Sequence, residues 1–194
     1  MRIVGGRHRG RSLQAPESLA VRPTADRTRE ALFNILTQGK LPWNGPAAAP
    51  GNPLAGIRVL DAFAGTGALG LEALSRGAEH VTFMENQAAA LNACRGNVRA
   101  LDEADRCAVL PCDVLRPPLA GAPCDLVLMD PPYNQDLAGP ALGALKEAGW
   151  LAPQALVAIE LMAKEPFAPP PGFARLDERN YGKARIVFLR RTGA

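Results

Sequence analysis

From residue 57 onward, short apolar segments alternate with segments of helical periodicity, and no other feature constrains the fold as strongly. The segment Leu126–Met129 is apolar throughout, which is typical of a parallel strand that helices cover on both faces. Strands are predicted at 57–61, 81–85, 106–110, 125–130 and 155–161, helices at 68–76, 87–101 and 138–149, and a final antiparallel pair at 174–180 and 184–190. This order predicts an α/β fold with a doubly wound sheet, in which ligands bind at the carboxyl ends of the strands.

The chain divides into three parts in this interpretation. Residues 1–40 are expected to form an N-terminal β-hairpin and helix, because alternating residues flank Gly5–Gly6 and apolar residues recur at helical spacing over 31–36. Residues 41–56 contain four prolines, three glycines and no charge, which is typical of a linker. Residues 57–194 would form the α/β domain. A chain of 194 residues has room for one such domain and not for a second.

Positive charge is concentrated at the two ends of the chain. The formal net charge is +3, but residues 1–30 and residues 175–194 each carry +4, whereas residues 31–174 carry −5. Arginines interleaved with glycines near the N-terminus suit the phosphate oxygens of a nucleic acid. These arginines are Arg2, Arg7, Arg9 and Arg11. A mobile, solvated arm is the alternative, and the arm by itself does not choose between the two.

Composition disfavours several classes of protein. No apolar run approaches the roughly 18 residues of a membrane span, and the start of the chain lacks the apolar core of a secretory signal. The four cysteines form no Cys-x-x-Cys pair, and the chain has two histidines, so no metal site is expected. Reduced, mostly buried thiols are typical of an intracellular protein. The sequence therefore predicts a cytoplasmic protein without metal and without membrane attachment.

A glycine-rich turn follows the first predicted strand of the α/β domain. Gly65, Gly67 and Gly70 satisfy the pattern G-x-G-x-x-G between a strand and a helix, where free amides at the helix N-terminus can meet a ligand. Glu85 ends the next strand, 20 residues after Gly65, and is placed to accept hydrogen bonds from a ribose diol. Both a dinucleotide and S-adenosylmethionine fit these residues.

Asp61 favours S-adenosylmethionine over a dinucleotide. A carboxylate that points into the turn would repel a pyrophosphate, but it would suit the cationic amino-acid part of S-adenosylmethionine. The alternative is that Asp61 caps the helix that follows. Asp113, after the third strand, is placed to accept a hydrogen bond from an adenine amine or, equally, to cap its own loop.

The fourth strand ends in the tetrapeptide Asp130-Pro131-Pro132-Tyr133, the most specific motif of the chain. The lone pair of an exocyclic amine on a nucleobase is delocalised into the ring, so the amine needs acceptors for its hydrogens before it can attack a methyl sulfonium. The Asp130 carboxylate and the Pro131 carbonyl could be those acceptors, because neither proline can donate into secondary structure. Tyr133 offers a ring on which a flipped-out base can stack. A rigid turn that leaves the strand is the alternative.

Together these motifs resemble the RsmD family. The resemblance lies in residues 3–11 (IVGGRHRGR), 22–34 (RPTADRTREALFN), 61–76 (DAFAGTGALGLEALSR) and 130–133 (DPPY), which follow the order of the family. Members of this family are bacterial methyltransferases that modify the exocyclic N2 of a guanine in 16S ribosomal RNA. The first two segments distinguish the family from methyltransferases in general, and the similarity covers nearly the whole chain.

The resemblance implies a class I methyltransferase fold, which is a Rossmann-like, doubly wound sheet of seven strands preceded by a hairpin that helps to hold RNA. It also implies S-adenosyl-L-methionine as cofactor and 16S rRNA in an assembling 30S subunit as partner, for an enzyme expected to be a monomer. The residues expected to bind the cofactor are Asp61, Phe63, Gly65, Gly67, Glu85, Asp113 and Thr24. The residues expected to be catalytic are Asp130, Pro131, Pro132 and Tyr133, and those expected to bind RNA are Arg2, Arg7, Arg9, Arg11, Arg22 and Arg29.

Three other functions stay open at this point. The same tetrapeptide could serve adenine N6 or cytosine N4 in DNA, because those amines pose the same chemical problem. An NAD-dependent oxidoreductase would account for the glycine motif and Glu85 but would leave the tetrapeptide unexplained. A non-catalytic RNA-binding module would account for the arginines alone.

Overall fold

The structure is a computed structural model, and it describes residues 1–16, 23–38, 41, 43 and 51–193, without the side chains of residues 23–26. The helices are α1 (Pro23–Thr37), α2 (Ala68–Ser75), α3 (Ala88–Ala100), the 3-10 helix η1 (Ala104–Arg106) and α4 (Ala138–Glu147). The strands are β1 (Arg58–Ala62), β2 (His80–Glu85), β3 (Cys107–Pro111), β4 (Cys124–Met129), β5 (Leu151–Met162), β6 (Phe173–Tyr181) and β7 (Ala184–Arg191). No helix in the described part of the chain is long and apolar enough to cross a membrane.

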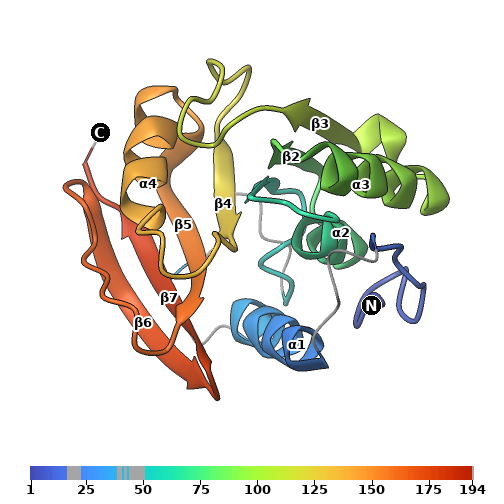
Figure 1. The fold of residues 1–194 in the computed structure, drawn as a ribbon, viewed down its shortest axis with the longest axis horizontal. Helices are drawn as coiled ribbons and strands as arrows, with labels where there is room; N and C mark the ends of the chain where they lie inside the picture. Colours follow the sequence, from blue (N-terminus) through green and yellow to red (C-terminus); the bar gives the residue numbers. More distant parts are fainter. Residues whose placement is uncertain (17–22, 39–40, 42, 44–50, 194) are drawn as a thin grey trace.

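The named strands form one seven-stranded sheet in the order β3-β2-β1-β4-β5-β7-β6. Strands β1 to β5 pair in parallel, whereas β7 pairs antiparallel with both β5 and β6. Figure 1 shows the sheet running from β6 and β7 at one side to β3 at the other. The chain order reverses between β1 and β4, and in open α/β sheets ligands bind beside such a reversal. The predicted doubly wound α/β fold is confirmed.

Strand β5 begins at Leu151, four residues before its predicted start. Cys124 of β4 pairs with Leu151, and the register then shifts before Leu126 pairs with Leu156. The extra residues of β5 in this bulge include Gln154, which has φ +64°. A bulge interrupts the apolar alternation of a strand, so the sequence pattern did not reveal this first part of β5.

Helices cover the two faces of the sheet unequally. Helices α1, α2 and α3 lie on one face, where Phe33, Leu74 and Val98 share a core with Leu128 of β4. Helix α4 covers the other face, where Leu142 and its neighbours pack against the alternate residues of β4 and β5. The central strands are therefore buried on both faces, as the continuous apolar run in β4 predicted.

The N-terminal residues form the predicted hairpin. Arg2 and Ser12 pair antiparallel, and the amide of Ile3 donates to the carbonyl of Arg11 at 2.9 Å. Ile3 and Leu13 are buried in the core that α1 and α2 share. The hairpin is thus packed onto the helical layer, and the alternative of a mobile, solvated arm is wrong for this segment.

A buried carboxylate on α2 holds the hairpin in place. Glu72 is inaccessible to solvent, and its two oxygens accept hydrogen bonds from the amides of Val4 and Gly5, each at 2.8 Å. The same carboxylate pairs with Arg76 at 2.7 Å, and the Nε of Arg29 lies 3.8 Å away. Two cations and two amides therefore compensate for the loss of water around Glu72.

The hairpin also approaches the end of α2 too closely for a side chain. The amide of Arg7 donates to the carbonyl of Ser75 at 2.8 Å. Gly6 has φ +74°, and a Cβ at this position would lie 1.8 Å from the carbonyl oxygen of Ser75. Position 6 therefore requires glycine both for its backbone conformation and for its contact with α2.

Asn97 of α3 joins the end of the hairpin to the glycine-rich turn. It is buried, and its Nδ2 donates to the carbonyls of Gln14 and Thr66, each at 3.0 Å. Its Oδ1 accepts from the amide of Gln14 at 2.7 Å. One side chain thus fixes the backbone of both segments.

We expect Glu72→Ala to lower the free energy of unfolding by about 3–5 kcal/mol, because it leaves buried arginine charge and two amides without their acceptor. Urea denaturation followed by circular dichroism measures this loss. Glu79→Ala is the matched control, since Glu79 is exposed and its removal is expected to change stability by no more than about 0.5 kcal/mol. Equal stability of Glu72→Ala and the control would contradict this account of the hairpin.

Candidate active site

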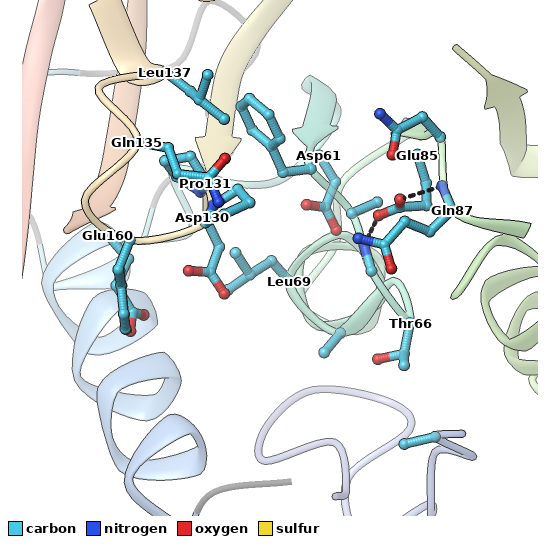
Figure 2. Close-up of a pocket in the computed structure, with 18 of the residues that line it drawn as sticks. Asp61, Thr66, Leu69, Glu85, Gln87, Asp130, Pro131, Gln135, Leu137 and Glu160 are labelled. Carbon is cyan, nitrogen blue, oxygen red and sulfur yellow. Dashed lines mark hydrogen bonds between the residues drawn. The ribbon is translucent and has the colours of Figure 1, made fainter. Parts of the chain in front are cut away.

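A pocket of about 780 Å³ opens at the carboxyl ends of the parallel strands, beside the reversal of chain order. Five carboxylates line it, and Arg29 is the single basic side chain among the described lining residues. In the order of the sheet, the carboxylates are Asp113, Glu85, Asp61, Asp130 and Glu160. Figure 2 shows Asp130 and Glu160 on one side of the pocket and Asp61 and Glu85 on the other. This excess of negative charge suits a cationic ligand and disfavours a phosphate.

The glycine-rich turn forms one wall of the pocket. Gly67 precedes α2 in the left-handed conformation, with φ +81°, which an L-residue rarely adopts. A Cβ on Gly70 would lie 2.4 Å from Phe83 of β2, so a glycine there lets α2 pack closely on the sheet. The turn brings the backbone of Gly65 to the pocket, as the motif predicted.

Asp61 is buried at the pocket, and it also caps α2. Its Oδ2 accepts a hydrogen bond from the amide of Gly70 at 2.8 Å, so the capping alternative considered above is observed. Burial raises the pKa of Asp61 well above its ordinary value, the bond from Gly70 opposes the rise, and the nearby charges of Asp130 and Glu85 add to it. Capping and cofactor binding are compatible, because a carboxylate has two oxygens and the residue also lines the pocket.

Glu85 and Asp113 each hold a loop at the rim. The two oxygens of Glu85 accept from the amides of Gly65 and Gln87, at 2.8 and 2.7 Å. Asp113 accepts from the amide of Leu115 at 2.9 Å, so the loop-capping alternative is also observed. Both side chains line the pocket, and each carboxylate oxygen can accept a second hydrogen bond. They are fixed in orientation before a ligand arrives.

The tetrapeptide leaves β4 and runs along the pocket. Asp130, Pro131, Pro132 and Tyr133 all line it. The hydroxyl of Tyr133 donates to Oε1 of Glu160 at 2.8 Å, which ties the turn to β5. The motif is therefore anchored on a neighbouring strand at the edge of the pocket.

Asp130 and Glu160 lie in surroundings that disfavour their charge. Loss of bulk water is the larger cause that raises the pKa of Asp130 to about 7, and the negative charge of Glu160 is the second. The side chain of Asp130 is exposed where it faces the pocket, so solvent screens part of this effect. Burial likewise raises the pKa of Glu160, while the hydrogen bond from Tyr133 and the charge of Arg29 lower it. The two carboxylates titrate as a pair.

One residue of the pocket was not predicted, and one predicted residue has a strained backbone. Glu160 was not predicted as a site residue, and the available signal was a single carboxylate near the end of a buried strand. Phe63, which was predicted, lines the pocket with φ +62°. Bulky residues rarely adopt this conformation, and such strain is found mainly at functional sites.

The predicted RNA-binding arginines lie in different surroundings. Arg29 is 3% exposed, donates to the carbonyl of Arg2 at 2.6 Å and lines the pocket, so it is no surface residue. The exposed Arg7 pairs with the buried Glu103, and Arg11 donates to a carbonyl at the end of α3. Arg22 lies outside the described residues, and so does the side chain of Thr24, whose backbone belongs to α1.

A cleft between the hairpin and α1 gathers exposed arginines. It has a volume of about 370 Å³, and Arg2, Arg9 and Arg27 line it together with Glu30. All three arginines are exposed. Arg27 was not predicted, because the sequence did not show that α1 would lie beside the hairpin. Among the described residues, no group of three or more His, Cys, Asp or Glu side chains could hold a metal ion.

The doubly wound sheet with an antiparallel β7, and the acidic pocket beside the tetrapeptide, define a class I methyltransferase. Two solved structures support this class. The yhhF protein of Escherichia coli, described as a methyltransferase, has a TM-score of 0.80 and 32% identity, with 100% of this chain and 99% of that chain covered. The methylase HI0767 of Haemophilus influenzae has a TM-score of 0.76 and 30% identity, with 99% and 98% covered.

The chain belongs to the family described as Conserved hypothetical protein 95, whose profile matches residues 1–190. A relative named Ribosomal RNA small subunit methyltransferase D, from Haemophilus influenzae, is 35% identical over 94% of this chain and 89% of its own length. The protein of that name from Escherichia coli is 37% identical over 82% of this chain and 74% of its own length. These relatives confirm the resemblance to the RsmD family.

We expect the methyl-transfer rate, as kcat/KM, to fall as the pH decreases through about 7, since Asp130 accepts hydrogen bonds best when ionised. Glu160→Gln should move this acid limb to lower pH, because it removes a negative charge that raises the pKa of Asp130. The other charged and polar side chains of the pocket are unchanged in this variant, so the shift of the acid limb reports the charge of Glu160 alone. The measurement is a series of initial rates across pH for the variant and the wild type.

Asp105→Asn is the control for this pH profile, because Asp105 is exposed on η1, away from the pocket. Its acid limb should coincide with that of the wild type. An acid limb that stays in place in Glu160→Gln would contradict the coupling of the two pocket carboxylates.

Proposed function

We propose that this chain transfers a methyl group from S-adenosyl-L-methionine to the exocyclic N2 amine of a guanine in 16S ribosomal RNA. One observation carries the proposal: the tetrapeptide Asp130–Tyr133 and the glycine-rich turn line the same acidic pocket. The names of the relatives support the ribosomal RNA substrate. An assembling 30S subunit in the cytoplasm is the corresponding partner, and one copy of the chain contains every residue assigned here.

The residues of the pocket fit the proposed cofactor. It carries positive charge on its sulfur and its amino group, and the excess of carboxylates favours such a ligand. Asp61 and the backbone at Gly65 would hold the amino-acid end, Glu85 would accept from the ribose diol, and Asp113 would accept from the adenine amine. Gly67 does not line the pocket and would act by shaping the turn. When bound, the cofactor supplies an electrophilic methyl group.

The tetrapeptide would prepare the amine of the target base. Asp130 and the carbonyl of Pro131 would each accept one hydrogen of the amine, which frees the nitrogen lone pair from the ring and directs it to the methyl group. Tyr133 would support the flipped base by stacking, with its hydroxyl held by Glu160. The amine loses one proton as the new N–C bond forms, and ionised Asp130 is the nearest acceptor for it in this scheme.

The exposed arginines beside α1 would hold the RNA outside the pocket. Arg2, Arg9 and Arg27 line a cleft at the surface, whereas Arg29 lines the pocket and would act on the base or the cofactor. Positive charge at this cleft would attract phosphates, and negative charge in the pocket would exclude them. Arg7 and Arg11 would add to the positive surface of the hairpin while they also hold it to α3 and η1.

The other functions considered above are less well supported. The row of carboxylates would repel the pyrophosphate of NAD, and a binding module without catalysis would leave the tetrapeptide without a role. Methylation of an adenine or cytosine amine in DNA uses the same chemistry, and nucleoside analysis of the labelled product decides between these substrates.

Asp130→Ala should reduce incorporation of labelled methyl groups into 30S subunits by about 100-fold or more, because an acceptor for the amine is lost. Asp130→Asn should retain more activity, since an amide oxygen still accepts one hydrogen bond. Cofactor affinity, measured by calorimetry, should be similar in both variants. Label in a nucleoside other than N2-methylguanosine, or full activity of Asp130→Ala, would overturn the proposed function.

Replacing Arg9 and Arg27 together with alanine should weaken RNA binding and lower the slope of log K against log salt concentration by about 2. Fluorescence anisotropy with 16S rRNA fragments at several salt concentrations measures both quantities. Lys146→Ala is the control, because Lys146 belongs to α4 on the opposite face of the sheet. Equal slopes for the double variant and the control would exclude this cleft as the RNA-binding surface.

A further inference from the structure

Glu160 places a second carboxylate next to the one in the tetrapeptide. Met129 at the end of β4 pairs with Ile159 of β5, so the residues that follow, Asp130 and Glu160, stand side by side at the carboxyl ends of these strands. Both line the pocket, and Figure 2 shows them on the same side of it. In the proposed function, Asp130 accepts a hydrogen bond from the target amine, whereas the carboxylate of Glu160 only holds the Tyr133 hydroxyl and contacts no part of the base.

Two fixed partners oppose the effect of burial on Glu160. Burial raises the pKa of Glu160, whereas the hydrogen bond from Tyr133 and the positive charge of Arg29 lower it. The Tyr133 hydroxyl donates to Oε1 at 2.8 Å and so fixes the orientation of the carboxylate, and a donor on a bound base would favour the ionised form further. An ionised carboxylate is an acceptor only, so Glu160 can serve a donor on the ligand and repels a lone pair.

The three candidate bases differ at the ring position next to the exocyclic amine. In guanine, the neighbour of the N2 amine is N1–H, which is a hydrogen-bond donor. In adenine, the neighbour of the N6 amine is N1 with a lone pair, and in cytosine the neighbour of the N4 amine is N3 with a lone pair. Two adjacent acceptors in the protein therefore match guanine and oppose the other two bases.

We propose that Glu160 accepts the N1–H of the target guanine while Asp130 and the Pro131 carbonyl hold its N2 amine. Glu160 is then the residue that selects guanine, and the tetrapeptide alone selects only an exocyclic amine. This inference rests on the proposed function, because it presumes that the amine acted upon belongs to a base in RNA. A purely structural Glu160 would orient Tyr133 and would not distinguish the bases.

A base analogue separates the two roles. 2-Aminopurine keeps the 2-amino group but has a lone pair at N1. 30S subunits are reconstituted with 16S rRNA that carries either guanine or 2-aminopurine at the methylated position, and kcat/KM is measured for both. The wild type should prefer guanine by about tenfold or more, since leaving the half-buried Glu160 carboxylate without a donor under a bound base is costly. Glu160→Ala should lose most of its activity on guanine and most of this preference.

Measuring the wild type and Glu160→Ala on both guanine and 2-aminopurine cancels the effects of the analogue that do not involve Glu160. 2-Aminopurine also lacks the O6 of guanine, but that loss is the same for the wild type and for Glu160→Ala. Tyr133→Phe is the matched variant, because it removes the hydroxyl that contacts Glu160 and keeps the carboxylate. It should be slower on both bases and should keep the preference for guanine.

Each outcome has one consequence. If Glu160→Ala keeps the full preference for guanine, the carboxylate does not contact N1–H and the inference is wrong, although the proposed function stands. If the wild type labels a nucleoside other than N2-methylguanosine, the proposed function itself fails before any base is compared. If Glu160→Ala does not fold, as judged by circular dichroism, Glu160→Leu takes its place because it keeps a side chain of similar size without any hydrogen-bond acceptor, and an unchanged preference in that variant overturns the inference equally.

Discussion

The buried carboxylate of Glu72 joins the N-terminal hairpin, α1 and α2 into one unit. Without the amides of Val4 and Gly5 and the charges of Arg76 and Arg29, α2 would bury a negative charge without compensation. The helix that begins at the glycine-rich turn thus depends on the hairpin for its own stability. The hairpin is part of the core of the protein and is no appendage to a methyltransferase domain.

Negative and positive side chains occupy different parts of this molecule. Carboxylates lie at the carboxyl ends of successive strands and face the pocket, whereas exposed arginines lie on the hairpin and on α1. A net charge of +3 conceals this arrangement, because the two populations nearly cancel. In the proposed function, this arrangement would favour a polyanion at the surface and disfavour it in the pocket, so that a single base could enter while its phosphates stay outside.

Much of this architecture followed from the sequence, because apolar runs and glycine spacing report on local structure. The order of strands and helices, the turn at Gly65 and the tetrapeptide at Asp130 were all predicted. The burial of individual side chains and their contacts with distant residues were not predictable, since both depend on how distant segments pack. Arg29 was expected among the RNA-binding arginines but is buried, and Arg27, on the same helix, is exposed. Glu160 belongs to no sequence motif, and it is recognised as a site residue only because the pairing of β5 with β4 places it beside Asp130.

The double hydrogen bond of Asn97 to the hairpin and to the glycine-rich turn has a thermodynamic consequence. A disordered arm would lose about 1–2 kcal/mol of backbone entropy per residue on meeting a partner. Here that cost is met during folding, so the hairpin is ordered before any partner arrives. An RNA that bound as proposed would therefore require little further ordering of this segment.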